Sequence, residues 1–238
     1  MIEKDCIFNQ DCITGMKDIP DGGVDLIVTD PPYLINYASS RRKNHRFCRP
    51  IMNDDNEVLI SDYLKECFRI LKGNSAAYVF CSAKTLDVFI PICKEVGFTL
   101  KNVLIWRKNN HTAGDLDAQY AQSYEPILFL NKGRRRINGK RIDDVWDFDR
   151  VAVDRLLHQN EKPVPLLMQC ILKSSEPGDL VFDGFMGSAS TAVACIRTER
   201  HFVGYELDKS YYDIAVKRLR NERQCGGGLW GYDEIGGF

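Results

Sequence analysis

The chain has 238 residues, of which 44% are hydrophobic and 27% are charged, and its formal net charge is −1. These values are typical of a soluble globular protein with enough apolar residues for a sizeable core, so we expect one domain over residues 1–238. The sequence has no apolar run near the roughly 20 residues that span a bilayer, and no signal-peptide layout, so we expect no membrane partner.

Short apolar runs and stretches of helical spacing alternate along the chain. In order, the first half predicts a strand at 6–9, a helix to about residue 19, a strand at 24–29, a helix at 59–71 that Gly73 ends, a strand at 76–81, a helix at 86–96 and a strand at 98–106. The second half predicts a strand at 125–130, a helix at 163–173, a strand at 179–183, a helix at 188–198, a strand at 202–206 and a helix at 209–220. This alternation predicts an α/β fold, a doubly wound, mostly parallel Rossmann-like sheet with helices on both faces.

Residues 30–33 read Asp-Pro-Pro-Tyr and directly follow the predicted strand at 24–29. Pro31 and Pro32 end the strand because they lack a backbone N–H, and Asp30 stands at its carboxyl end, where open α/β sheets bind ligands. Asp30 and the Pro31 carbonyl can accept hydrogen bonds from an exocyclic amine, while the Tyr33 ring can stack on the planar ring that carries this amine. The four residues also fit a plain strand-to-turn connection, so the motif needs support from its context.

A second motif spans residues 180–191 and predicts a strand, a glycine-bearing turn and a helix, with the spacing G-x-x-G-x-A. Dinucleotide sites have G-x-G-x-x-G instead, and a tight β-to-α connection alone would explain the turn. Glu206 follows the next predicted strand, about 20 residues downstream, where an acid can bind both hydroxyls of an adenosine ribose. We therefore favour an adenosine cofactor without phosphates. S-adenosylmethionine fits, with its carboxylate facing the turn amides and a helix N-terminus.

The nine cysteines are an odd number and include no C-x-x-C pair. This pattern indicates neither a disulfide framework nor a zinc site. We therefore expect a reduced, cytoplasmic protein without a metal.

Basic residues gather in two predicted loops, although the near-neutral net charge by itself argues against a nucleic-acid partner. Charge runs are usually solvated faces, and we interpret the cluster of Lys217, Arg218, Arg220 and Arg223 along a predicted helix in that way. In the loops, contacts with nucleic-acid phosphates are the better interpretation. The loop residues concerned are Arg41, Arg42, Lys43 and Arg46, and Arg134, Arg135 and Arg136.

Over nearly its whole length the chain resembles the β group of amino-methylating DNA methyltransferases. The resemblance rests on both motifs and on the blocks Asn9-Gln10-Asp11-Cys12, Leu104-Ile105-Trp106-Arg107-Lys108, Tyr124-Glu125-Pro126-Ile127-Leu128-Phe129, His158-Gln159-Asn160-Glu161-Lys162-Pro163 and Gly204-Tyr205-Glu206-Leu207-Asp208. In that family the catalytic half precedes the cofactor half, as the two motifs do here. The chain departs from the family at Gly184, where Pro is usual, and at Ala189, where Gly is usual. We expect these changes to shift the turn geometry or the cofactor affinity.

The resemblance implies methyl transfer from S-adenosylmethionine to the N6 amine of a flipped-out adenine in DNA. It makes Asp30, Pro31, Pro32 and Tyr33 catalytic. It implies a cofactor site at Asp11, His158, Lys162, Pro163, Asp183, Gly184, Phe185, Met186, Gly187, Ser188, Thr191, Glu206 and Leu207. Lys162 or its neighbours would lie near the methionine end of the cofactor. A target-recognition segment is expected at about residues 109–157, which is short for the family.

Several alternatives stay open from the sequence. Cytosine N4 presents the same amine geometry, and the aspartate at position 30 favours adenine by analogy only. Relatives that methylate a protein glutamine have Asn at this position, and RNA is a further substrate class. A nucleic-acid-binding module with a decayed cofactor site would explain Gly184 and Ala189. The oligomeric state, including a homodimer, is not set by the sequence.

Overall fold

The computed structural model describes residues 2–35, 55–111, 115–152, 154–157 and 160–224. Its strands are β1 (Cys6–Phe8), β2 (Val24–Thr29), β3 (Leu71–Phe80), β4 (Thr99–Arg107), β5 (Tyr124–Lys132), β6 (Val145–Asp147), β7 (Leu180–Asp183) and β8 (His201–Tyr205). Its helices are α1 (Cys12–Met16), α2 (Glu57–Ile70), α3 (Leu86–Glu95), α4 (Val164–Ser174), α5 (Ser190–Arg197) and α6 (Lys209–Gln224). None of these helices is both long enough and apolar enough to cross a membrane.

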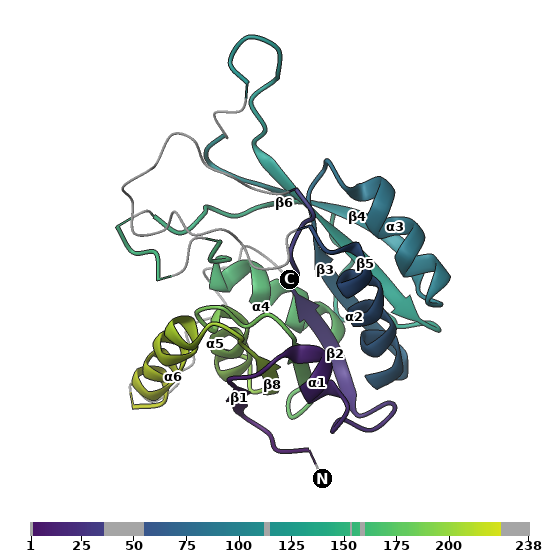
Figure 1. The fold of residues 1–238 in the computed structure, drawn as a ribbon, viewed down its shortest axis with the longest axis vertical. Helices are drawn as coiled ribbons and strands as arrows, with labels where there is room; N and C mark the ends of the chain where they lie inside the picture. The colour runs from purple at the N-terminus through teal and green to yellow at the C-terminus, as the bar shows by residue number, and fades with distance from the viewer. Residues whose placement is uncertain (1, 36–54, 112–114, 153, 158–159, 225–238) are drawn as a thin grey trace.

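The described strands form one sheet in the order β1-β8-β7-β2-β3-β5-β4-β6, and Figure 1 shows helices on both of its faces. Most residues of the central strands β2, β3 and β7 are apolar and buried, because helices cover both faces of the sheet there. In β2, Leu26 and Val28 pack in the core beneath α4, α5 and α6, whereas Ile27 packs in the core beneath α1, α2 and α3. The doubly wound α/β fold predicted from the sequence is confirmed.

The sheet places the two motifs at one edge. β2 pairs in parallel with β3 on one side and with β7 on the other, and β7 pairs in parallel with β8. The connection from β2 to β3 runs through α2 on one face, and that from β7 to β8 runs through α5 on the other. The carboxyl ends of β2 and β7 therefore flank a topological switch point, where sheets of this kind bind their ligands.

Three details differ from the sequence prediction. β5 runs antiparallel to both β3 and β4, because no helix intervenes between β4 and β5 to carry the chain back across the sheet. The short strand β6 lies in a segment with no predicted structure and pairs with the edge strand β4. Gly73 does not end the helix: α2 ends at Ile70, Leu71 is already extended, and Gly73 belongs to β3.

Candidate active site

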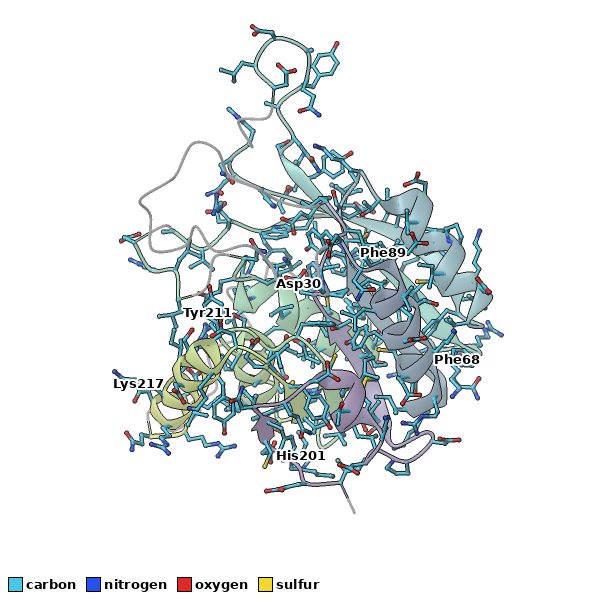
Figure 2. The ribbon with its side chains drawn as sticks, viewed as in Figure 1. Asp30, Phe68, Phe89, His201, Tyr211 and Lys217 are labelled. Atoms are coloured by element: carbon cyan, nitrogen blue, oxygen red, sulfur yellow. The ribbon has the colours of Figure 1, made fainter. Side chains whose placement is uncertain are left out.

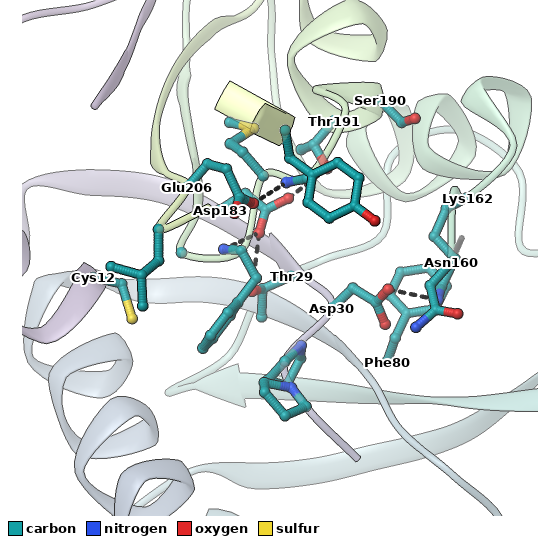
Figure 3. A pocket seen from close by; sticks show the side chains of 18 of the residues that line it. Cys12, Thr29, Asp30, Phe80, Asn160, Lys162, Asp183, Ser190, Thr191 and Glu206 are labelled. Atoms are coloured by element: carbon teal, nitrogen blue, oxygen red, sulfur yellow. Dashed lines mark hydrogen bonds and ion pairs between the residues drawn. The ribbon is translucent and has the colours of Figure 1, made fainter. Parts of the chain in front are cut away.

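A pocket opens at the carboxyl edge of the sheet and joins the two motifs (Figure 3). Asp30, which lines this pocket, lies near the centre of the view in Figure 2. Residues predicted from the sequence that line this pocket are Asp11, Asp30, Pro31, Pro32, Tyr33, Lys162, Asp183, Gly184, Phe185, Met186, Gly187, Ser188, Thr191, Glu206 and Leu207. The pocket therefore brings the amine-holding motif and the glycine turn into one cavity.

Both oxygens of the Asp30 carboxylate have partners. The Tyr33 hydroxyl donates to Oδ1 at 2.5 Å, and the Lys162 ammonium donates to Oδ2 at 2.6 Å. The Asp30 side chain is only 22% exposed. Burial raises its pKa above the usual range, and the Lys162 charge opposes that rise. A carboxylate has about four lone-pair positions, so this one can still accept a hydrogen bond from a ligand amine.

The Tyr33 hydroxyl has a role that the sequence did not predict. Besides its bond to Asp30, it accepts a hydrogen bond from Lys162 at 2.9 Å and lies 3.3 Å from Oε2 of Glu125. The Tyr33 carbonyl accepts a hydrogen bond from the Thr85 hydroxyl at 2.9 Å. These contacts fix the ring and make the hydroxyl part of the support for Asp30, in addition to any stacking face.

Lys162 lies against the Asp-Pro-Pro-Tyr motif. Its ammonium is 3.4 Å from Glu125, and the other oxygen of Glu125 pairs with Lys108. Glu125 is the second residue of β5 and belongs to a block that resembles the family, but nothing in its local sequence marked it as a site residue. Its importance comes from a contact between residues that are distant in the chain.

Asp183 supports the glycine turn from inside the fold. Its carboxylate accepts hydrogen bonds from the Thr29 hydroxyl at 3.1 Å, the Phe185 amide at 3.0 Å and the Thr191 hydroxyl at 2.7 Å. Burial raises its pKa to about 6, against the effect of these bonds. The side chain thus ties β2, the turn and α5 together. Thr29 was not among the predicted site residues.

Glu206 projects into the pocket from the end of β8. One carboxylate oxygen accepts from the Gly187 amide at 2.8 Å, and the other accepts from the Asp208 amide, also at 2.8 Å. The Asn9 side chain donates to the Glu206 carbonyl at 2.8 Å and holds the backbone beside β1. Each carboxylate oxygen keeps acceptor capacity, so this side chain fits the diol of a ribose.

The glycine at position 184 is explained by a neighbour that is distant in sequence. A Cβ placed there would lie 2.5 Å from the Tyr63 ring, and the Gly184 amide donates to the Tyr63 hydroxyl at 3.2 Å. A proline would both clash and remove this donor. Tyr63 also bonds Thr29 at 2.6 Å, so its ring is held in the space that a side chain at position 184 would need. Ala189 adopts φ +66°, a left-handed conformation that glycine adopts more readily.

We therefore expect Gly184→Ala to lower the free energy of unfolding by about 1–3 kcal/mol, the usual cost of overpacking a core. Chemical denaturation measures this change. Gly73→Ala is the matched control because nothing lies within 4 Å of a Cβ at that position. Equal effects at the two glycines would contradict the explanation given for Gly184.

Some predicted residues are not part of this pocket. Pro163 is the N-cap of α4 beside the pocket, and it does not line it. Arg134 follows β5, whose last residue Lys132 pairs with Ser75 of β3, so Arg134–Arg136 lie beyond the end of β5 that points away from the pocket. There Arg135 bonds Asn138 at 3.0 Å. His158 and the residues Arg41, Arg42, Lys43 and Arg46 lie outside the described part of the chain.

Other pocket residues were not singled out from the sequence. Phe80 ends β3, and its ring centroid lies 5.2 Å from the Lys162 ammonium. Glu161 is held by Arg218 of α6 at 2.8 Å. Arg218 also bonds the Ser188 carbonyl at 3.0 Å, so it supports the site and is not a member of a solvated face. Within the described ranges, no group of three or more His, Cys, Asp or Glu side chains is placed to hold a metal.

The chain is similar to known DNA methyltransferases along most of its length. A profile of the N6_N4_Mtase family, described as DNA methylase, matches residues 24–217. The chain is 29% identical to DNA adenine methyltransferase YhdJ of Escherichia coli (strain K12), over 91% of this chain and 83% of that protein. It is 28% identical to Type II methyltransferase M.HinfI of Haemophilus influenzae, over 90% of this chain and 68% of that protein.

Solved structures have the same fold. The M1.HpyAVI–SAM complex superimposes with a TM-score of 0.70 at 25% identity, over 90% of this chain and 98% of that one. PvuII DNA methyltransferase, described as cytosine-N4-specific, has a TM-score of 0.75 at 15% identity, over 92% and 87%, and it shares the fold alone. The family profile covers both the Asp-Pro-Pro-Tyr motif and the glycine turn. The chain belongs to the N6_N4_Mtase family of DNA methylases.

Proposed function

We propose that this chain transfers the methyl group of S-adenosylmethionine to the N6 amine of an adenine in DNA. The observation that carries the proposal is that one pocket is lined by Asp30, by Tyr33 and by the glycine turn whose Gly187 amide bonds Glu206. As a member of its family, the chain is an S-adenosylmethionine-dependent DNA methyltransferase. The choice of adenine is supported by the relative named as a DNA adenine methyltransferase.

The pocket residues have two roles in this proposal, binding of the cofactor and activation of the amine. When bound, the cofactor supplies a methyl group on a positively charged sulfur. Glu206 would hold its ribose, and the turn amides with the start of α5 would face its carboxylate. The adenine amine is a poor nucleophile because its lone pair is delocalised into the ring. Asp30 and the Pro31 carbonyl would accept its two hydrogens, orient the lone pair and stabilise the developing positive charge.

The test is incubation of the protein with methyl-labelled S-adenosylmethionine and, separately, duplex DNA, single-stranded DNA and tRNA, followed by nucleoside analysis. We expect labelled N6-methyldeoxyadenosine from DNA. N4-methyldeoxycytidine would overturn the choice of base but keep the enzyme class. Label in tRNA alone would overturn the choice of DNA as the substrate. If no product is labelled, the chain would be a nucleic-acid-binding module without methyltransferase activity.

The Glu206→Ala variant is expected to bind S-adenosylmethionine about 1–3 kcal/mol more weakly, since the ribose would lose charge-assisted hydrogen bonds. Isothermal titration calorimetry measures the dissociation constant. Asp213→Ala is the control, because Asp213 is an acid of the neighbouring helix α6 that is 61% exposed and does not line the pocket. An unchanged dissociation constant for Glu206→Ala would contradict the ribose assignment.

The phosphate backbone of the DNA would be bound by residues outside the pocket. We propose phosphate contacts for Arg41, Arg42, Lys43 and Arg46, and target recognition by residues 109–157 of the one domain. Neutralising these four basic residues should flatten the salt dependence of DNA binding, by about one unit of slope for each lost contact. The same measurement on Arg134–Arg136 distinguishes a DNA contact from the structural role that the Arg135 bonds indicate.

The proposed cytoplasmic location, and a homodimer as the assembly to be tested, rest on the sequence interpretation.

A further inference from the structure

We infer that Lys162 and Glu125 are positioning residues: Lys162 holds the Asp30 carboxylate turned toward the target amine, and Glu125 fixes the Lys162 ammonium in place. The inference rests on the proposed function, because it assigns Asp30 the role of amine acceptor. It gives Lys162 a place in the catalytic half of the pocket, in contrast to the methionine end of the cofactor expected from the family resemblance.

Four charged side chains alternate in sign across this part of the site. Lys108, at the start of the loop after β4, pairs with Glu125 of β5. Glu125 also lies 3.4 Å from the ammonium of Lys162, which precedes α4. The Lys162 ammonium in turn lies 2.6 Å from the carboxylate of Asp30, which follows β2. Their exposed fractions are 16% for Lys108, 19% for Glu125, 7% for Lys162 and 22% for Asp30. Each of these four mostly buried charges needs a partner of opposite sign, because an unpaired buried charge costs folding free energy.

The surroundings of Lys162 direct its ammonium at Asp30. The ring centroids of Tyr33 and Phe80 lie 5.3 Å and 5.2 Å from its nitrogen, so aromatic faces bound the space around it. Its two acid partners then fix the direction of the head group. Figure 3 shows Lys162 and Asp30 joined across the catalytic side of the pocket, away from Glu206.

The two residues act on Asp30 with opposite sign. Burial raises the Asp30 pKa, the Lys162 charge lowers it, and the Glu125 charge raises it. The other titratable groups around it are the Tyr33 hydroxyl, Asp183 of β7 and the Cys81 thiol after β3. An ionised Asp30 is the better acceptor for the amine, so activity should fall as pH drops through its pKa.

The experiment compares wild type with Lys162→Met and Glu125→Gln. The first readout is the titration of the Asp30 carboxyl carbon, followed by NMR in protein labelled at aspartate and assigned with Asp30→Asn. We expect the midpoint to rise by about 1–3 pH units in Lys162→Met, the usual effect of losing a close opposite charge, and to fall in Glu125→Gln. The second readout is the acid limb of kcat/KM on DNA, which should move in the same two directions.

A merely structural role would not produce opposite shifts. Midpoints that stay unchanged, or that move in the same direction, would overturn the inference. So would weaker cofactor binding by Lys162→Met with an unmoved Asp30 midpoint, which would return Lys162 to the cofactor site. If Lys162→Met fails to fold, the near-isosteric Glu125→Gln decides by itself. The carboxyl titration needs no substrate, so a failure of the proposed function appears separately, as absence of N6-methyladenine with wild type.

Discussion

Asp30→Ala is expected to abolish methyl transfer while leaving the cofactor site intact. In the proposed mechanism the variant removes one of two acceptors that orient the amine hydrogens, and that interaction grows as positive charge develops on the nitrogen. A single preorganised contact of this kind contributes about 3–4 kcal/mol, so single-turnover rates should fall by at least about 100-fold. Radiolabel transfer to DNA under cofactor-saturated conditions measures the loss, and calorimetry measures cofactor affinity.

The control for Asp30→Ala is Asp62→Ala on α2, where the aspartate is 54% exposed and pairs only weakly with Lys65 at 3.6 Å. Because Asp30→Ala leaves the buried Lys162 ammonium without one of its acids, thermal unfolding must accompany the kinetics. Asp30→Asn keeps the side-chain volume and gives a second measurement if the alanine variant is unstable. Methylation at the wild-type rate by both variants would remove Asp30 from the mechanism.

The parts of the site that the sequence predicted are those that depend on residues close together in the chain. Asp30 follows an apolar strand directly, and the turn at 184–187 lies between a strand and a helix, so local pattern alone gave the fold class and both halves of the pocket. Glu206 was found because the distance from a glycine turn to the end of the next strand is nearly constant in such folds.

The parts that were missed depend on contacts between distant segments. Lys162 meets Asp30 across 132 residues, and Tyr63 meets Gly184 across 121. Neither pair leaves a periodic signal in the sequence. Glu125 sits in a strand that was predicted correctly, yet its partners became visible only when β5 was found beside β3. The antiparallel direction of β5 could have been inferred from the helix-free loop that precedes it.

Tyr33 variants are expected to lose activity in two separable steps. Tyr33→Phe removes the donor that lies 2.5 Å from Asp30, a bond to a charged group worth about 1.5–3 kcal/mol, and it keeps the ring. Tyr33→Ala removes the ring as well, and the stacking of a base on an aromatic face adds about 1–3 kcal/mol. We therefore expect turnover to fall in the order wild type, Tyr33→Phe, Tyr33→Ala, as measured by methyl transfer at saturating cofactor.

The target base separates the two contributions of Tyr33. A mismatched adenine is already partly unstacked, so the extra loss in Tyr33→Ala should shrink on a mismatched duplex. The loss in Tyr33→Phe should be the same on matched and mismatched DNA, because its cause is the support of Asp30 and not the capture of the base. Thr85→Val is a useful companion, since it removes only the hydroxyl that holds the Tyr33 carbonyl at 2.9 Å. Wild-type activity in Tyr33→Phe would show that the hydroxyl is dispensable and that Lys162 alone is sufficient to position Asp30.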